Sequence, residues 1–173
     1  VAVTGVATFA AGAGNNITLN NNNNFSTVVI TTGRNVTLND TGAIILGTSS
    51  VSGTLSVTAN GNITDSGTLV VAGTTTLAAG NGNDITLNSA ANNFSTVVIT
   101  TGRNITLVDT NALAIGNSTV AGTFTATAGG NITVNSTINA NNGGSNITLT
   151  TTAGDILDGG ASLIRGSVVT LTA

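Results

Sequence analysis

Short alternations of apolar and polar residues run along the whole chain and predict a β-rich fold. In segments such as Ile17-Thr18-Leu19, the outer two side chains are aliphatic and the central one is polar. Because side chains alternate between the two faces of a strand, this pattern indicates strands with one buried face. The segments are too short and too β-branched for helices. Most follow Gly or Asn, which we expect to adopt the left-handed conformation at sharp corners.

A long internal repeat gives these strand-like segments an order. Residues 24–35 recur without change at 93–104, an offset of 69 residues. We expect two long copies at about 5–73 and 74–142 and a partial third at 143–173, all within a single domain, 1–173. Strand-like segments recur about every eight or nine residues, so three of them make a turn of about 20 residues. Three such turns would make up one copy.

These periods predict a right-handed parallel β-helix, or β-solenoid, with about three short strands per rung and roughly 7–8 rungs. Successive rungs of such a coil lie about 4.8 Å apart, so equivalent residues form columns. An antiparallel sandwich also has many short strands, but it gives no reason for near-identical rungs at a fixed period. The right-handed sense is the rule for parallel crossovers.

Several residues recur at equivalent positions and are expected to form structural columns along the coil. They are Phe25, Phe94, Arg34, Arg103, Asn16, Asn35, Asn104, Asn131 and Asn146. We expect the two Phe residues to lie three rungs apart in one column and to fill the core or a corner. Asn at a corner is suited to a stack in which amide side chains bond from rung to rung.

Two equivalent Arg–Asp pairs are the main charged features. Arg34 and Asp40 are six residues apart, as are Arg103 and Asp109. This spacing brings each pair within reach across a turn, and we expect solvated corner charges that contribute little to stability.

The composition narrows the possible chemistry. The chain uses eleven kinds of amino acid, contains no His, Cys, Glu or Lys, and has a formal net charge of −3. It therefore lacks the usual zinc ligands and most acid–base groups, and three Arg residues do not make a basic patch for nucleic acid or anionic lipid. Apolar runs of about four residues are far shorter than a membrane helix. We expect no enzyme, no cofactor, no metal, no nucleic-acid partner and no membrane insertion.

Two stretches near the end of the chain resemble a known family. The residues 130–134, Gly-Asn-Ile-Thr-Val, followed by 136–140, Ser-Thr-Ile-Asn-Ala, are similar to the repeats of filamentous haemagglutinin-like exoproteins. The same holds for 145–150 followed by 153–156. Those proteins are large bacterial surface or secreted proteins with right-handed β-helical shafts, often exported by two-partner secretion and acting in adhesion. The resemblance implies a shaft segment located outside the cell or at its surface.

Two sequence features are similar to known binding sites but also have simpler structural interpretations. Gly80-Asn81-Gly82-Asn83-Asp84 is superficially similar to a calcium-binding repeat, but the first copy has Asn16 in place of Asp84, which favours a plain corner. Outward-facing Thr residues form the kind of surface seen on ice-binding β-helices. Thr is also the best polar strand former for an exposed face, and we expect the triplets to fall on different faces in an irregular Thr-x-Thr register.

The chain enters the strand pattern at once and ends on a strand-like segment, without a capping element at either end. We expect head-to-tail self-association or covalent continuation of a longer solenoid, with a host or surface glycan as a further partner. The function that we expect is that of a structural shaft segment of an extracellular bacterial filament or surface adhesin. The alternative is a binding module, with an ice-binding Thr face or glycan-binding loops.

Overall fold

The computed structural model describes residues 1–140, 144–160 and 162–173, and in these ranges the chain consists of strands joined by turns, without a helix. Within these ranges, no helix is long and apolar enough to cross a membrane. The strands are β1 (Ala2–Ala10), β2 (Ile17–Thr32), β3 (Val36–Asp40), β4 (Ile44–Leu46), β5 (Ser49–Val51), β6 (Leu55–Ala59), β7 (Ile63–Asp65), β8 (Leu69–Ala78), β9 (Ile85–Leu87), β10 (Asn93–Thr101), β11 (Ile105–Asp109), β12 (Leu113–Ile115), β13 (Ser118–Thr119), β14 (Phe124–Ala128), β15 (Ile132–Val134), β16 (Thr137–Asn139), β17 (Asn146–Thr151), β18 (Ile156–Asp158), β19 (Leu163–Arg165) and β20 (Val168–Thr172).

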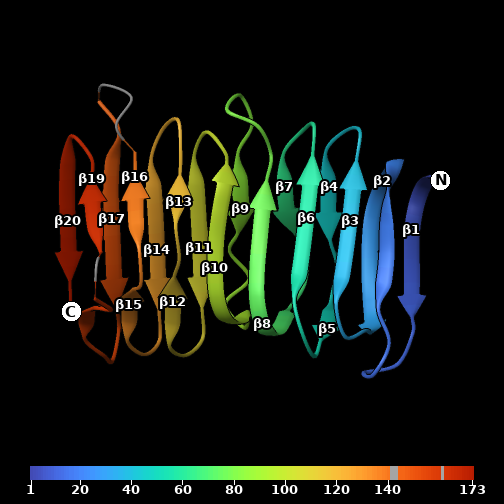
Figure 1. Ribbon diagram of the computed structural model, residues 1–173, viewed down its shortest axis with the longest axis horizontal. Coiled ribbons are helices and arrows are strands. Elements are labelled where there is room, and N and C mark those ends of the chain that lie inside the picture. The colour runs from blue at the N-terminus through green and yellow to red at the C-terminus, as the bar shows by residue number, and fades with distance from the viewer. Residues whose placement is uncertain (141–143, 161) are drawn as a thin grey trace.

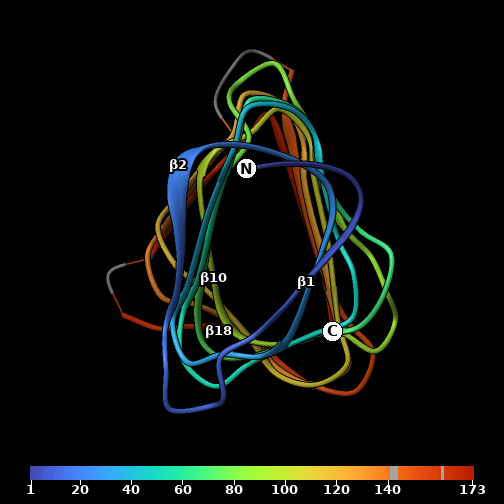
Figure 2. The same cartoon turned by 90° about the vertical axis from the view of Figure 1, so that its right-hand side faces the viewer.

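The strands stack side by side into a rod, with the N-terminus at one end and the C-terminus at the other (Figure 1). Every pairing between named strands is parallel, as in β3 with β6 and β11 with β14. Figure 2 looks along the rod from its N-terminal end, and the chain runs clockwise as it recedes from the viewer. The molecule is therefore a right-handed parallel β-solenoid of about eight turns, which confirms the predicted fold class.

Two long faces and a short third side enclose the core. Face A contains, in order, β1, residues 27–32 of β2, and then β4, β7, β9, β11, β14, β17 and β20. Face B contains residues 17–23 of β2, then β3, β6, 75–78 of β8, 96–101 of β10, β12, β15 and β18. In the first half the third side follows face A and is formed by β5 and the first residues of β8 and β10. In the second half it follows face B instead and is formed by β13, β16 and β19, which make a separate three-stranded sheet.

One copy of the 69-residue repeat makes about three and a half turns, half a turn more than predicted. Starting from Thr27, the stacked partners in the next three rungs are Ile45, Thr64 and Thr86. The residue equivalent to Thr27 in the second copy is Thr96, which lies beyond Thr86 on the opposite face. The prediction counted the interval that holds the Asn-rich stretch (20–24 in the first copy, 88–93 in the second) as one long turn. In the first copy the chain lies on face A at 6–10, on face B at 17–19 and on face A again at 27–32, so this interval makes about one and a half turns.

Equivalent elements therefore change face from one copy to the next. Strand β3 lies in face B and its counterpart β11 in face A, while β4 lies in face A and β12 in face B. The prediction that Phe25 and Phe94 share a column is wrong for this reason. Phe25 pairs with Val3, whereas Phe94 pairs with Val71 on the other side of the coil.

The core is a continuous column of aliphatic side chains. In strands such as β9 and β12, the outer two residues are buried and the central one is partly exposed, as the alternation predicts. Phe25 and Phe94 are at most 1% exposed and fill the interior, where Phe25 also meets Phe9 edge to face with 5.9 Å between ring centroids. Both faces contribute the same aliphatic pattern to the core, so a half-turn offset between copies leaves the packing intact.

The corners do not use Asn in the way that we expected. Within the described residues, only Gly has a positive φ, and Gly12 and Gly80 occupy equivalent corners with φ of 83° and 82°. Asn residues there keep ordinary backbone angles, and their side chains bond to the next rung instead, as described below. The expected copy boundary at 142–143 includes residues outside the described ranges.

Candidate functional site

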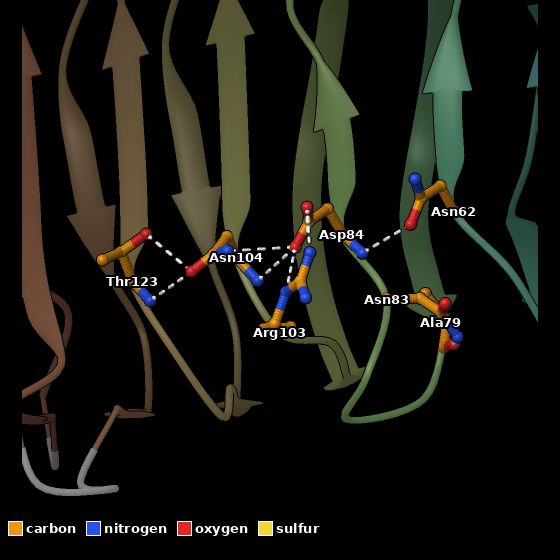
Figure 3. A network of polar contacts seen from close by, with 7 residues as sticks. All are labelled: Asn62, Ala79, Asn83, Asp84, Arg103, Asn104 and Thr123. Carbon is orange, nitrogen blue, oxygen red and sulfur yellow. Dashed lines mark hydrogen bonds and ion pairs between the residues drawn. The ribbon is translucent and has the colours of Figure 1, made fainter.

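A ladder of side-chain oxygens joins successive rungs at the corner where the chain enters face A (Figure 3). Oδ1 of Asn62 accepts a hydrogen bond from the backbone N–H of Asp84, at 2.9 Å. Oδ1 of Asp84 accepts from the N–H of Asn104, and Oδ1 of Asn104 accepts from the N–H of Thr123, both at 3.1 Å. Each side chain thus satisfies a backbone donor at the start of the next strand, much as an N-cap residue does for a helix.

The same arrangement recurs at the entrance to face B. Oδ1 of Asn16 accepts from the N–H of Asn35, at 3.3 Å, and Oδ1 of Asn35 accepts from the N–H of Thr54, at 3.0 Å. The Asn or Asp before most of the aliphatic-Thr-aliphatic triplets therefore has a structural task, which explains why the motif repeats.

The two remaining predicted Asn residues lie at the entrances to face B and face A. Oδ1 of Asn131 accepts from the N–H of Asp155, at 2.9 Å. Asn146 is the exposed first residue of β17. Because Ile147 stacks on Phe124 and Phe124 on Ile105, Asn146 lies in line with Asn104, two rungs further on. The five predicted Asn residues are thus distributed over more than one column.

Arg103 forms an ion pair with Asp84, not with Asp109 (Figure 3). The guanidinium donates from Nε to Oδ1 at 2.8 Å and from Nη2 to Oδ2 at 2.7 Å. These hydrogen bonds lower the pKa of the Asp84 carboxyl and raise that of Arg103. In the first copy, Arg34 donates from Nε to Oδ1 of Asn16 at 3.2 Å. The Arg–Asp spacing of six residues therefore brings neither predicted pair together.

Asp40 and Asp109 are structural residues in the interior, contrary to the expected solvated charges. Their exposed fractions are 1% and 3%. Oδ2 of Asp40 accepts from the N–H of Phe25, and Oδ2 of Asp109 from the N–H of Phe94, both at 2.6 Å. The other carboxylate oxygen of Asp109 accepts from the N–H of Asn111 at 2.9 Å. Burial raises the pKa of Asp109, against the opposing effect of its two backbone donors.

Sequence reasoning missed the residues that anchor the two Asn-rich stretches. Asn92 is fully buried; its Nδ2 donates to Oδ2 of Asp65 at 2.6 Å, and its Oδ1 accepts from the N–H of Leu69 at 2.8 Å. Asn23, at the equivalent position, is 2% exposed, and its Nδ2 donates to the carbonyl of Leu19 at 2.9 Å. The available signal was the shared 69-residue offset of these two Asn residues.

Outward-facing Thr residues form columns that are more regular than the sequence suggested. On face A, Thr occupies the same register position in six successive rungs. This column, which we call the A column, consists of Thr64, Thr86, Thr106, Thr125, Thr148 and Thr170. A second outward position in the last three of these rungs holds Thr127, Thr150 and Thr172.

The chemistry of these groups is that of a scaffold. Both carboxylate oxygens of Asp84 are engaged by Arg103, and those of Asp40 and Asp109 are engaged by backbone donors. Within the described ranges, no three acidic, His or Cys residues gather as a metal would require. The polar groups at the corners hold rungs together, and the open surface consists largely of hydroxyls, methyls and amides.

The match to a family model covers almost the whole chain. A model described as repeats of unknown function (DUF5649) matches residues 1–32, 33–101 and 102–163. Its middle match, 33–101, is 69 residues long, which is the length of the internal repeat, but it begins at a different point of that repeat. No curated protein and no solved structure matches the chain. The chain therefore belongs to the DUF5649 family of repeats, a family whose description gives no function.

Proposed function

We propose that the chain is a non-enzymatic shaft segment of an extracellular bacterial filament or surface adhesin. The observation that carries this proposal is the uninterrupted core. Buried aliphatic side chains from Ala7 to Leu149 form one cluster that runs along the coil. Because each rung bonds to both neighbours and shares this core, the rod resists bending and holds whatever it carries at a fixed distance.

The polar corners support the same proposal. The carboxylates of Asp40, Asp84 and Asp109 are all engaged in bonds that fix corners or rungs. An enzyme of the pectin-lyase type, which shares the general fold, would need such groups free in a groove. The resemblance of residues 130–140 to filamentous haemagglutinin-like repeats supports a bacterial surface location.

The spacer role is tested by changing the length of the rod. Deletion of residues 33–101 joins Thr32 to Gly102, the equivalent of Gly33, and preserves the repeat. With about 4.8 Å per rung, losing three and a half turns should shorten the rod by about 17 Å. Small-angle X-ray scattering of the chain and of the deletion variant measures this change. A variant that unfolds while the intact chain forms a rod would contradict the modular spacer.

The surface location requires a separate experiment on cells that produce the full native protein. An epitope tag in the turn at Gly82, where an added side chain meets no atom within 4 Å, should be reached by antibody and by external protease on intact cells. A cytoplasmic protein serves as the control for lysis. Protection of the tag until the cells are lysed would refute the extracellular assignment.

A further inference from the structure

The A column, together with the second outward Thr position beside it, forms a regular two-dimensional array. Thr125 and Thr127 lie on one strand, Thr148 and Thr150 on the next, and Thr170 and Thr172 on the last. Strands in a sheet lie about 4.8 Å apart, and alternate residues on one strand are about 6.6 Å apart. The hydroxyl and methyl groups therefore repeat at nearly constant distances in both directions.

The array is neutral and rigid. The inward residues between the first two Thr pairs, Ala126 and Leu149, are buried, so the core lies directly beneath them, whereas Leu171 in the last rung is 51% exposed. The ion pair of Asp84 and Arg103 lies at the corner, and the Asp109 carboxylate points inward. Thr side chains are stiff at χ1, so a surface built from them loses little conformational entropy when it is covered.

The area and composition of the array disfavour a protein or a sugar as its occupant. The A column extends over five rung spacings and the second Thr position over two, so together they cover on the order of 100–200 Å², well below the ~800 Å² per partner of a stable protein interface. Sugar rings are commonly held against exposed aromatic faces, but Phe25, Phe94 and Phe124 are at most 1% exposed and Phe9 packs against the core. The neutral surface also offers no charge complementarity to an ionic ligand.

We propose that the A column and its neighbouring Thr positions bind the surface of ice. A crystal of water is neutral, and its oxygen atoms repeat at spacings close to those of the array. A Thr hydroxyl can donate and accept hydrogen bonds with such a lattice, while the adjacent methyl group displaces disordered water. The shaft proposed above does not depend on this property, and the property does not depend on the location of the shaft.

The test measures thermal hysteresis and ice-crystal shape with the purified chain. The unmodified chain should lower the freezing point below the melting point and produce faceted crystals. Thr148→Tyr places a bulky ring at the centre of the array and should reduce hysteresis several-fold. Thr133→Tyr is the matched control, because Thr133 faces outward on face B between Ala114 and Leu157 and should leave hysteresis unchanged. Circular dichroism establishes that both variants remain folded.

Each alternative result overturns the proposal. A chain that shows no hysteresis and is excluded from a growing ice front has no ice-binding face. Full hysteresis in the folded Thr148→Tyr variant would show that the A column does not take part in ice binding. Equal losses in Thr148→Tyr and Thr133→Tyr would show that the effect does not belong to one face.

Discussion

Replacement of Thr75 by Val should make the solenoid more stable. Thr75 is fully buried, and its Oγ1 has no hydrogen-bond partner among the described residues. Its stacked neighbours on face B are Leu55 on one side and Val97 on the other. The hydroxyl therefore interrupts an aliphatic column, and Val has nearly the same shape without the polar atom.

The expected gain follows from the cost of burying an unpaired polar group. Mutational data place this cost at about 1–3 kcal/mol. Thr75→Val removes the cost and adds a buried methyl in place of the oxygen, so we expect the free energy of unfolding to rise by about 1–2 kcal/mol. Thr76→Val is the control. Thr76 points outward in the same strand, and its replacement should change the free energy by less than about 0.5 kcal/mol.

The measurement is urea unfolding followed by far-ultraviolet circular dichroism, because the chain has no Trp or Tyr for fluorescence. Both variants and the parent chain should have the same slope with denaturant, so that midpoints can be compared directly. A lower midpoint for Thr75→Val would show that the hydroxyl is satisfied in the folded chain, and would refute the reasoning. An equal rise in Thr76→Val would attribute the gain to strand propensity instead.

Four further predictions concern the corners and the buried acid. Asp109→Ala leaves the backbone donors of Phe94 and Asn111 without acceptors and should cost about 2–4 kcal/mol in urea unfolding. Burial raises the pKa of Asp109 in the folded chain, so protonation of this carboxyl should stabilise the fold. The stabilisation should be complete below the ordinary carboxyl pKa and should be lost as the pH rises through the raised pKa. Asp109→Asn should abolish this part of the pH dependence of unfolding. Gly129→Ala places a Cβ against the backbone carbonyl of Thr110 and should cost about 1–3 kcal/mol, whereas Gly82→Ala, in open space, should be nearly neutral. Asp84→Asn breaks a partly exposed ion pair and should lower the free energy of unfolding by less than about 1 kcal/mol, as the natural Asn16 of the first copy suggests; a larger loss would contradict this view.

The fold class was predictable because the alternation and the 69-residue repeat act through simple geometry. The triplet Ile85-Thr86-Leu87 buries its outer residues and exposes its centre, as period-two side-chain placement requires. The number of turns per copy was not predictable to within half a turn. It depends on how far the Asn-rich stretches extend, and that in turn depends on buried contacts such as the one between Asn92 and Asp65.

The candidate polar residues were identified correctly as recurrent, but their roles required three-dimensional information. A spacing of six residues put Arg103 within reach of Asp109 in sequence, whereas the coil stacks it on Asp84, which is 19 residues away. In a solenoid the nearest polar neighbours are one turn apart, so contacts between rungs outweigh contacts along the strand. Asn104 was expected to bond to amide side chains of neighbouring rungs, and its Oδ1 instead accepts from the backbone N–H of Thr123, one rung further on.

The half turn at the end of each 69-residue copy has a consequence for longer arrays of this family. Adding or removing one copy rotates everything beyond it by about 180° around the axis as well as moving it along the rod. The parity of the copy number, odd or even, thus determines which way a distal part of the protein faces. A change by two copies alters reach alone, because the chain then returns to its original face.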